Sequence, residues 1–175
     1  MKRIILITGG QRSGKSAYAE QLALSLDAHP IYMATAHIWD EEFRLRVIQH
    51  QRRRGGQWEN IEEERLLSKY CIYNKVCVID CLTLWYTNFF YDDGKNTAEE
   101  IDVQEVLRNL KDEFDRFTQQ EATFIFVTNE IGSGGVSDHL LQRKFTDLEG
   151  WMNQYVAQRA DEVILMVAGI PVKIK

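Results

Sequence analysis

Apolar residues occur along this chain in short continuous runs. Four of these runs cover residues 3–8, 30–35, 76–80 and 123–129, and a fifth covers residues 162–174 with an interruption at Gly169-Ile170-Pro171. An apolar run of this length, without polar alternation, is typical of a strand that is buried on both faces of a parallel sheet. The pattern therefore predicts four buried strands, followed by one or two closing strands near the C-terminus.

Other segments carry apolar residues at helical spacing. After the first predicted strand, four such residues share one face: Ala19, Leu22, Ala23 and Leu26. Their spacing predicts an amphipathic helix whose apolar face packs on the sheet. The same periodicity predicts helices over residues 96–120 and 146–159, the first with Thr97 and Glu100 placed for a capping box. Residues 40–54 begin with acidic side chains, which also favours a helix there.

The alternation of strands with helices determines the fold class. Strands that follow one another through a helix pair in parallel, and the helices then cover both faces of the sheet. We therefore expect an α/β fold, a three-layer sandwich with a mostly parallel central sheet. The chain has 175 residues, of which 45% are hydrophobic and 27% are charged, and this is enough to enclose a core. A single domain over residues 1–175 is expected.

Charge and cysteine content disfavour several classes of protein. The formal net charge is −5, whereas a general nucleic-acid or acidic-membrane binder carries a basic excess. No apolar run approaches the roughly 18 residues of a membrane-spanning helix, so we expect no membrane span. The three cysteines are an odd number without a Cys-x2-Cys pair, which disfavours a disulfide framework. We expect a cytoplasmic protein.

The segment GGQRSGKS at residues 9–16 directly follows the first predicted strand. Its spacing matches Gly-x4-Gly-Lys-Ser, the pattern of a loop whose backbone N–H groups surround a phosphate at a helix N-terminus. Lys15 would reach the β- and γ-phosphates, and the Ser16 hydroxyl would ligate Mg²⁺. The candidate nucleotide-binding residues of this loop are Gly9, Gly10, Gln11, Arg12, Ser13, Gly14, Lys15 and Ser16. The pattern predicts a nucleotide but does not name the reaction.

A nucleotide-bound Mg²⁺ usually requires a second acidic group at the end of a neighbouring strand. Asp80 closes the predicted strand 76–80 and is the preferred metal candidate together with Ser16. Glu130, which follows the predicted strand 123–129, is the competing candidate. Asp80 could also be an acidic residue that simply ends a strand and begins a turn.

The segment RVIQHQRRR at residues 46–54 contains a histidine between arginines. Helical spacing places Arg46, His50 and Arg54 in one row at i, i+4 and i+8. Neighbouring cations disfavour the imidazolium form, so His50 would remain neutral and nucleophilic while the arginines bind phosphates. Taken alone, this segment is more typical of a solvated basic helix face.

Together these motifs resemble one known family, the bifunctional adenosylcobinamide kinase and adenosylcobinamide-phosphate guanylyltransferase. The matching segments are TGGQRSGKS (8–16), YMAT (32–35), RVIQHQRRR (46–54), DCLTLWYTN (80–88), VTNEIGSGG (127–135), RKFTDLEGWMNQ (143–154) and the terminal ADEVILMVAGIPVKIK. The resemblance extends over nearly the whole chain and is more specific than the phosphate loop alone. It implies a P-loop NTPase fold of the RecA-like type and assembly as a homotrimer.

The resemblance also implies roles for single residues. His50 would take up GMP from GTP as a covalent phosphoramidate, and Lys15 would serve as the second catalytic residue. The further nucleotide-binding residues implied are Ala34, Thr35, Ala36, Gln51, Arg52, Arg53, Arg54 and Glu62. Glu62 would contact guanosine, although Glu63 or Glu64 could be the true match in this acidic run.

This sequence departs from the family pattern at two of these sites. Gln11 stands where the family often has alanine, and Asp80 stands where some members have glutamate. Both changes are tolerable, because the loop acts through its backbone and either carboxylate can serve Mg²⁺.

The activity implied by the resemblance consists of two reactions. The enzyme would phosphorylate adenosylcobinamide with ATP or GTP, and would then transfer GMP from GTP to adenosylcobinamide phosphate to give adenosylcobinamide-GDP. Its expected partners are these corrinoids, ATP, GTP and Mg²⁺, with no nucleic acid. Five aromatic residues could line the corrinoid site or belong to the core or a subunit interface: Trp39, Trp85, Tyr86, Phe89 and Phe90.

Two other functions remain open at this point. A P-loop small-molecule kinase without guanylyltransferase activity would explain residues 9–16 and Asp80, but it would leave His50 without a task. A nucleotide-dependent regulator or nucleic-acid motor is compatible with a RecA-like fold, although the acidic composition disfavours it.

Overall fold

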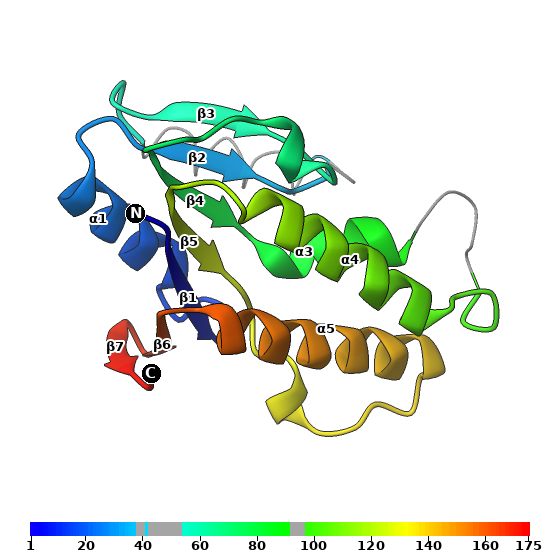
Figure 1. Ribbon diagram of the computed structural model, residues 1–175. Coiled ribbons are helices and arrows are strands. Elements are labelled where there is room, and N and C mark those ends of the chain that lie inside the picture. Colours follow the sequence, from blue (N-terminus) through cyan, green and yellow to red (C-terminus); the bar gives the residue numbers. More distant parts are fainter. Residues whose placement is uncertain (38–40, 42–53, 92–96) are drawn as a thin grey trace.

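A seven-stranded β-sheet forms the centre of the molecule (Figure 1). The computed structural model describes residues 1–37, 41, 54–91 and 97–175. In spatial order the strands are β3 (Glu59–Glu62), β2 (Ile31–Ala34), β4 (Val76–Asp80), β5 (Thr123–Val127), β1 (Arg3–Gly9), β6 (Glu162–Val167) and β7 (Ile170–Lys173). Neighbouring strands pair in parallel from β3 to β6, whereas β7 runs antiparallel to β6. The predicted mostly parallel sheet is confirmed.

Each apolar run that predicts a strand forms one. The stretch 162–174 forms both β6 and β7, and the chain reverses between them at Ala168 and Gly169, which have φ values of 50° and 83°. The apolar pattern does not predict β3, because three of its four residues are polar. This strand pairs with β2 at the end of the sheet, where an apolar residue at every position is not required.

Helices cover both faces of the sheet and complete the three predicted layers. The described helices are α1 (Lys15–Leu26), α3 (Leu82–Phe90), α4 (Val103–Phe117) and α5 (Leu140–Arg159), with short 3₁₀ turns η1 (Leu67–Lys69) and η2 (Gly132–Gly134). α1 lies on one face, and α3, α4 and α5 lie on the other (Figure 1). None of these described helices is both long and apolar enough to cross a membrane.

Alternate side chains of the central strands enter two separate cores. In β1, Ile4 and Leu6 join the core that α3, α4 and α5 cover, whereas Ile5 and Ile7 join the core that contains Ala19 of α1. All four of these β1 side chains are at most 2% exposed. A central strand covered on both faces needs apolar residues at consecutive positions, which explains the unbroken runs in the sequence.

α3 is a helix that the sequence pattern does not predict. Its residues Trp85, Tyr86 and Phe90 are at most 1% exposed and belong to the core. Burial on nearly every side leaves this short helix without the polar face from which helical periodicity is recognised. These three aromatic residues, which were also candidates for the corrinoid site, therefore belong to the core.

The predicted helix boundaries need correction. The Thr97 hydroxyl donates to Glu100 at 2.9 Å as in a capping box, but the pair closes a separate turn. The helix itself begins at Val103, where the Asp102 carboxylate caps it by accepting from the N–H groups of the next turn. α5 begins at Leu140, six residues earlier than expected, and includes Gly150. The predicted helix at 40–54 lies almost wholly outside the described residues.

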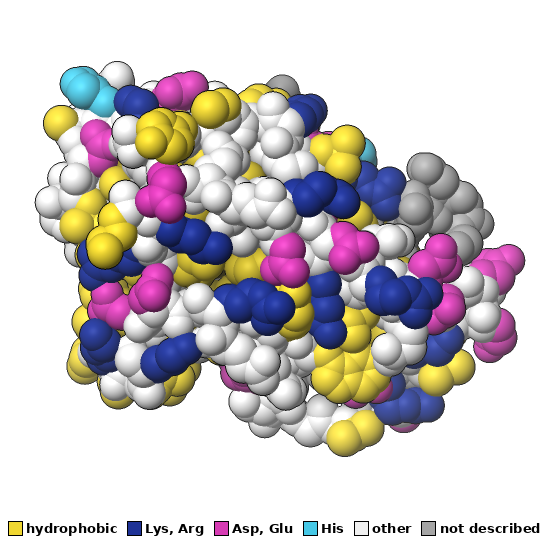
Figure 2. Space-filling model, viewed as in Figure 1, with side chains coloured by type: hydrophobic (Ala, Val, Ile, Leu, Met, Phe, Trp, Pro, Cys, Tyr) yellow, Lys and Arg dark blue, Asp and Glu magenta, His cyan; other side chains and the backbone are white. Residues whose placement is uncertain are grey.

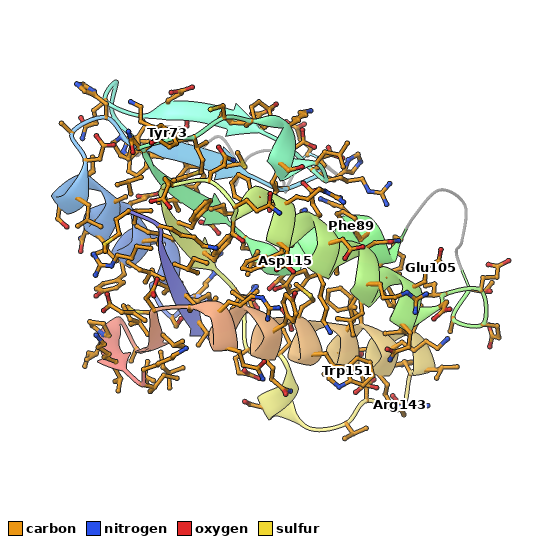
Figure 3. All side chains as sticks on the ribbon, in the orientation of Figure 1. Tyr73, Phe89, Glu105, Asp115, Arg143 and Trp151 are labelled. Carbon is orange, nitrogen blue, oxygen red and sulfur yellow. The ribbon has the colours of Figure 1, made fainter. Side chains whose placement is uncertain are left out.

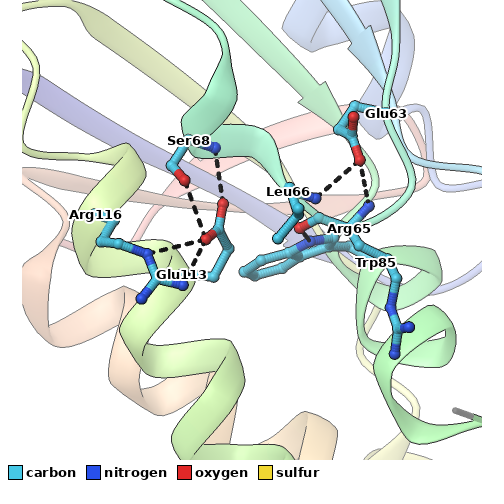
Figure 4. A network of polar contacts seen from close by, with 7 residues as sticks. All are labelled: Glu63, Arg65, Leu66, Ser68, Trp85, Glu113 and Arg116. Atoms are coloured by element: carbon cyan, nitrogen blue, oxygen red, sulfur yellow. Dashed lines mark hydrogen bonds and ion pairs between the residues drawn. The ribbon is translucent and has the colours of Figure 1, made fainter.

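Acidic side chains hold α4 against its neighbours. The Glu113 carboxylate is 1% exposed and accepts from the backbone N–H of Ser68 at 2.7 Å, from the Ser68 hydroxyl and from Arg116 (Figure 4). These bonds join α4 to the η1 segment. Asp115, labelled in Figure 3, lies on another part of α4. Its carboxylate accepts from the hydroxyl of Tyr155 in α5 at 2.6 Å.

The Glu113 network yields a test of stability. Glu113→Ala should lower the free energy of unfolding by about 3 kcal/mol, because it leaves the N–H group of Ser68 without its acceptor and removes the buried counter-charge of Arg116. Urea unfolding followed by circular dichroism measures this change. Asp112→Ala removes an exposed acidic side chain from the same helix and should cost about 0.5 kcal/mol or less. Equal losses in the two variants would contradict a structural role for the buried network.

Candidate nucleotide-binding site

The phosphate loop connects β1 to α1 and has the backbone that its glycines permit. Gly9 and Gly14 have φ values of 149° and 95°. A Cβ atom on Gly9 would lie 2.5 Å from the Met166 carbonyl oxygen, and one on Gly14 would lie 3.3 Å from the Gly169 Cα. The N–H of Gly169 also donates to the Ser13 carbonyl at 3.0 Å, so the β6–β7 turn is hydrogen-bonded to the loop and supports it. Glycine is required at both positions by conformation and by close approach.

The polar groups of the loop point to an anionic ligand. Lys15 is the first residue of α1, is 7% exposed, and its ammonium donates to the Gly10 carbonyl at 2.7 Å. Burial lowers the pKa of Lys15, and nearby acidic groups that include Asp80 and Glu149 oppose that shift. In the part of the chain that the structure describes, the buried Ser13 hydroxyl has no hydrogen-bond partner. A phosphate would supply acceptors for both groups.

Asp80 lies at the carboxyl end of β4, where its Oδ2 atom accepts from the Tyr32 hydroxyl at 2.7 Å. Its charge also acts on Lys15, so this carboxylate and the phosphate loop belong to one site. Carboxylate and hydroxyl oxygens are the donors that Mg²⁺ prefers, and Mg²⁺ commonly binds through one or two such groups plus substrate phosphates. The predicted pair of Ser16 and Asp80 therefore fits Mg²⁺ chemically. No cluster of three or more His, Cys, Asp or Glu side chains able to hold a metal occurs among the described residues.

The competing metal candidate, Glu130, also lies beside the loop. It is exposed, and its backbone N–H donates to the Gly9 carbonyl at 3.1 Å. Both carboxylates thus follow strands that end at this edge of the sheet, and the choice of Asp80 stays a prediction.

The end of β2 is fastened to the end of β4 by Thr35. This side chain is fully buried, and its hydroxyl donates to the Cys81 carbonyl at 2.7 Å. The Thr35 carbonyl accepts from the Asn88 side chain at 2.7 Å. The Thr35 hydroxyl is therefore used within the protein, and Ala34 and Ala36 on either side are partly buried. Contact of residues 34–36 with a nucleotide would involve mainly their backbone.

The arginine-rich segment is described only at its last residue. His50, Gln51, Arg52 and Arg53 lie outside the described residues. The guanidinium of Arg54 stacks on the Tyr32 ring at 3.5 Å from its centroid, and its Nε donates to Asn60 at 3.1 Å. Its side chain is 3% exposed. The described contacts of Arg54 are thus with the protein, and its predicted contact with nucleotide stays a prediction.

The three candidate glutamates after β3 have different surroundings. Glu63 is buried and accepts from the backbone N–H groups of Arg65 and Leu66 (Figure 4). It also pairs with Lys69. Glu64 pairs with His37 at 2.9 Å. Glu62 is exposed at the end of β3. Since Glu63 stabilises the local turn, the geometry favours Glu62 over Glu63 as a ligand for a base.

A buried carboxyl group near the loop was not predicted from the sequence. Glu149 of α5 is 1% exposed, and its Oε1 accepts from the Thr83 hydroxyl at 2.6 Å. The same hydroxyl oxygen accepts from the backbone and side-chain N–H groups of Asn129 at 3.0 and 3.1 Å. Burial raises the pKa of Glu149 to about 7, and the charge of Glu130 acts in the same direction. The sequence signal was a pair of polar residues, Glu149 and Asn153, one turn apart between the apolar positions of the helix.

A cavity of about 450 Å³ lies between the end of α3 and the start of α5. Its lining residues are Thr87, Tyr91, His139, Leu141, Gln142 and Phe145. Of the aromatic residues considered for the corrinoid, Phe89 is half-buried beside the Arg65 guanidinium, and Trp39 lies outside the described residues. Neither Phe89 nor the three core aromatics line this cavity.

Comparison with known families decides among the functions that such a site could serve. The family model described as cobinamide kinase / cobinamide phosphate guanyltransferase matches residues 5–174. The chain belongs to this family. Members of the cobinamide kinase / cobinamide phosphate guanyltransferase family are transferases, so the chain is an enzyme of this class and the resemblance in its motifs is confirmed.

Curated relatives match over nearly their whole length. The bifunctional adenosylcobalamin biosynthesis protein CobU of Salmonella typhimurium is 37% identical over 182 residues, which cover 98% of this chain and 99% of that protein. The protein of the same name from Escherichia coli is 35% identical over 181 residues, with 98% and 99% covered. CobP of Pseudomonas aeruginosa is 35% identical, with 97% and 96% covered.

A solved structure with a similar fold supports the predicted fold class. A prototypical ATPase from the type III secretion system of pathogenic bacteria superposes with a TM-score of 0.57 at 14% identity. The match covers 94% of this chain and 52% of the ATPase. At this identity the similarity concerns the fold alone, and it agrees with the predicted P-loop NTPase class.

The raised pKa of Glu149 predicts that the free energy of unfolding depends on pH. A carboxyl with a folded-state pKa near 7 and an ordinary value near 4.5 stabilises the fold below pH 4.5, and this contribution is lost as the pH rises through 7. Glu149→Gln cannot ionise, so its stability relative to wild type should rise by about 3 kcal/mol between pH 4.5 and pH 7.5. Urea unfolding at several pH values measures the difference.

The exposed carboxyl of Glu105 on α4 supplies a matched control (Figure 3). Glu105→Gln should keep a nearly constant offset from wild type over the same pH range. If Glu149→Gln behaves in the same way, Glu149 does not ionise with a raised pKa.

Proposed function

We propose that this enzyme phosphorylates adenosylcobinamide with ATP or GTP and then guanylylates the product through a histidine intermediate. The proposal rests on the family membership and on the braced phosphate loop, in which buried Lys15 lies near the carboxylate of Asp80. The relatives carry the word bifunctional in their names, which supports two activities rather than a kinase alone. The final product is adenosylcobinamide-GDP.

In the kinase step, the primary hydroxyl of adenosylcobinamide attacks the γ-phosphorus of the nucleotide. The bond between this phosphorus and the β–γ bridging oxygen breaks, the nucleoside diphosphate leaves, and the hydroxyl loses its proton. Lys15 and the loop N–H groups stabilise the charge that spreads over the transferring phosphoryl group. Mg²⁺ held by Ser16 and Asp80 would neutralise charge on the phosphate oxygens.

In the guanylyl step, a neutral ring nitrogen of His50 attacks the α-phosphorus of GTP and pyrophosphate leaves. The phosphate of adenosylcobinamide phosphate then attacks the same phosphorus, the N–P bond breaks, and His50 is regenerated. We assign phosphate contacts to residues 51–54, contacts of the nucleotide to residues 34–36, and the guanine contact to Glu62. The neighbouring arginines would keep the His50 imidazole neutral before attack.

We further infer a homotrimer in the cytoplasm. The trimer is implied by the family resemblance of the motifs, and light scattering after gel filtration measures it. All three cysteines are free thiols, which agrees with a reducing compartment.

Lys15→Ala should reduce both reactions by about 10²–10³-fold, because one loop binds the phosphates of the donor in each reaction. Separate assays of corrinoid phosphorylation and of GMP incorporation into the protein measure the two effects. Lys111→Ala on α4 is the matched control, since Lys111 lies over the Tyr155 ring away from the loop. Loss of phosphorylation with unchanged GMP incorporation would show that the two reactions use separate nucleotide sites.

His50→Asn should abolish GMP incorporation and formation of adenosylcobinamide-GDP, while phosphorylation of adenosylcobinamide persists at least in part. The kinase step needs no protein nucleophile, so the two activities must separate. Chromatography of the corrinoid products, together with α-labelled GTP, measures this separation. A mutant that still forms an acid-labile GMP adduct would exclude His50 as the nucleophile.

The same labelling distinguishes the rival functions. A P-loop kinase alone would leave no covalent label from α-labelled GTP on the wild-type protein. A nucleic-acid motor would show hydrolysis that nucleic acid stimulates. The visible face in Figure 2 intersperses basic with acidic side chains and shows no continuous basic stripe among its described residues, so it gives the motor no support.

A further inference from the structure

Tyr32 contacts both Asp80 and Arg54, two candidate site residues that belong to different sequence motifs. It lies in β2, is 4% exposed, and faces the core on the α1 side of the sheet. Its hydroxyl donates to Asp80 at 2.7 Å, and its ring carries the Arg54 guanidinium at 3.5 Å. The Trp58 ring packs edge-on against it with centroids 5.9 Å apart.

The hydroxyl of Tyr32 fixes the orientation of the Asp80 carboxylate. The phenol is the donor and the Asp80 Oδ2 atom is the acceptor of this bond. A tyrosine ring wedged in a packed core has few rotamers, and its hydrogen bond therefore holds the carboxylate in one position. Partners that orient a metal-binding carboxylate typically change metal affinity by 10–100-fold.

The ring of Tyr32 anchors the end of the arginine-rich segment. The Arg54 side chain is 3% exposed, and a buried charge is costly unless it finds partners. Its guanidinium stacks on the Tyr32 face, and its Nε donates to Asn60 of β3 at 3.1 Å. Its Nη1 lies 3.9 Å from Glu20 of α1 and makes no hydrogen bond among the described residues. Arg54 follows His50, the proposed nucleophile, by four residues in the sequence.

We propose that Tyr32 is a positioning residue for both reactions, whose hydroxyl orients Asp80 and whose ring anchors Arg54. This inference rests on the proposed function and deepens it, because it assigns the two reactions a shared structural element. The hydroxyl contacts Asp80 and the ring contacts Arg54, and substitution can therefore separate their effects.

Tyr32→Phe removes the hydroxyl and keeps the ring. Its affinity for Mn²⁺–GDP should fall about 10-fold, whereas its affinity for GDP in excess EDTA should stay within twofold of wild type. Titration calorimetry measures both values without any turnover. With metal at saturation, GMP incorporation should also stay within about threefold of wild type, because Arg54 keeps its anchor.

The matched control is Tyr155→Phe, which deletes an equivalent bond from a phenol to a carboxylate at 2.6 Å between α5 and α4. This variant should leave both affinities unchanged. In an Asp80→Asn background, Tyr32→Phe should add no more than twofold to the loss of metal-dependent affinity, since its effect passes through Asp80.

Arg54→Leu tests the second arm, because it keeps an apolar side chain but removes the stacked guanidinium. GMP incorporation should fall at least 10-fold more than affinity for Mn²⁺–GDP, because the variant removes the stacked anchor as well as a phosphate contact. Losses of equal size in the two measurements would make Arg54 a phosphate ligand alone and would overturn its role as an anchor.

The proposal is overturned if Tyr32→Phe matches Tyr155→Phe, or if it weakens GDP equally with and without metal, as a general loss of structure would. These affinities can be read even if wild-type protein forms no GMP adduct, an outcome that would contradict the proposed function alone. Circular dichroism of each variant confirms that the folded protein is being compared.

Discussion

Parallel pairing from β3 to β6 places the carboxyl ends of these strands at one edge of the sheet, and the site depends on this constraint. The phosphate loop follows β1, Asp80 ends β4, Thr35 follows β2 and Glu130 follows β5. Residues that are up to about 120 positions apart in the chain thereby surround one loop. Continuous apolar runs and covering helices on both faces stabilise this pairing, so the core determines the geometry of the site.

Two buried networks approach the loop from opposite faces of the sheet. On the α1 side, Tyr32 connects Asp80 with Arg54. On the α5 side, Thr83 connects Glu149 with Asn129. The ammonium of Lys15 lies within electrostatic range of both carboxylates. Such networks hold charged groups rigidly in a poorly hydrated setting, where their effect on a phosphate is greater than in water.

The sequence predicted the parts of the molecule that follow from periodicity or from a motif. The central strands and the phosphate loop belong to this group, since a buried parallel strand and a Gly-x4-Gly-Lys-Ser loop each have a distinct pattern. β3 escaped prediction because it is polar and lies at the sheet edge, and α3 escaped because it is buried nearly all round. The capping box at Thr97 formed in a turn, while the neighbouring Asp102 capped the helix. Roles of Tyr32 and Glu149 could not be predicted, because they depend on contacts across 48 and 66 sequence positions.

In the proposed function, one phosphate loop serves both a phosphoryl transfer and a covalent guanylyl transfer. The mass of the intact wild-type protein after exposure to GTP and Mg²⁺, followed by peptide mapping, tests this directly. We expect the addition of a single GMP on the peptide that contains His50, stable in alkali and lost in acid, as a phosphoramidate requires. If the protein hydrolyses GTP yet gains no GMP, or gains it on another residue, the covalent mechanism at His50 is wrong.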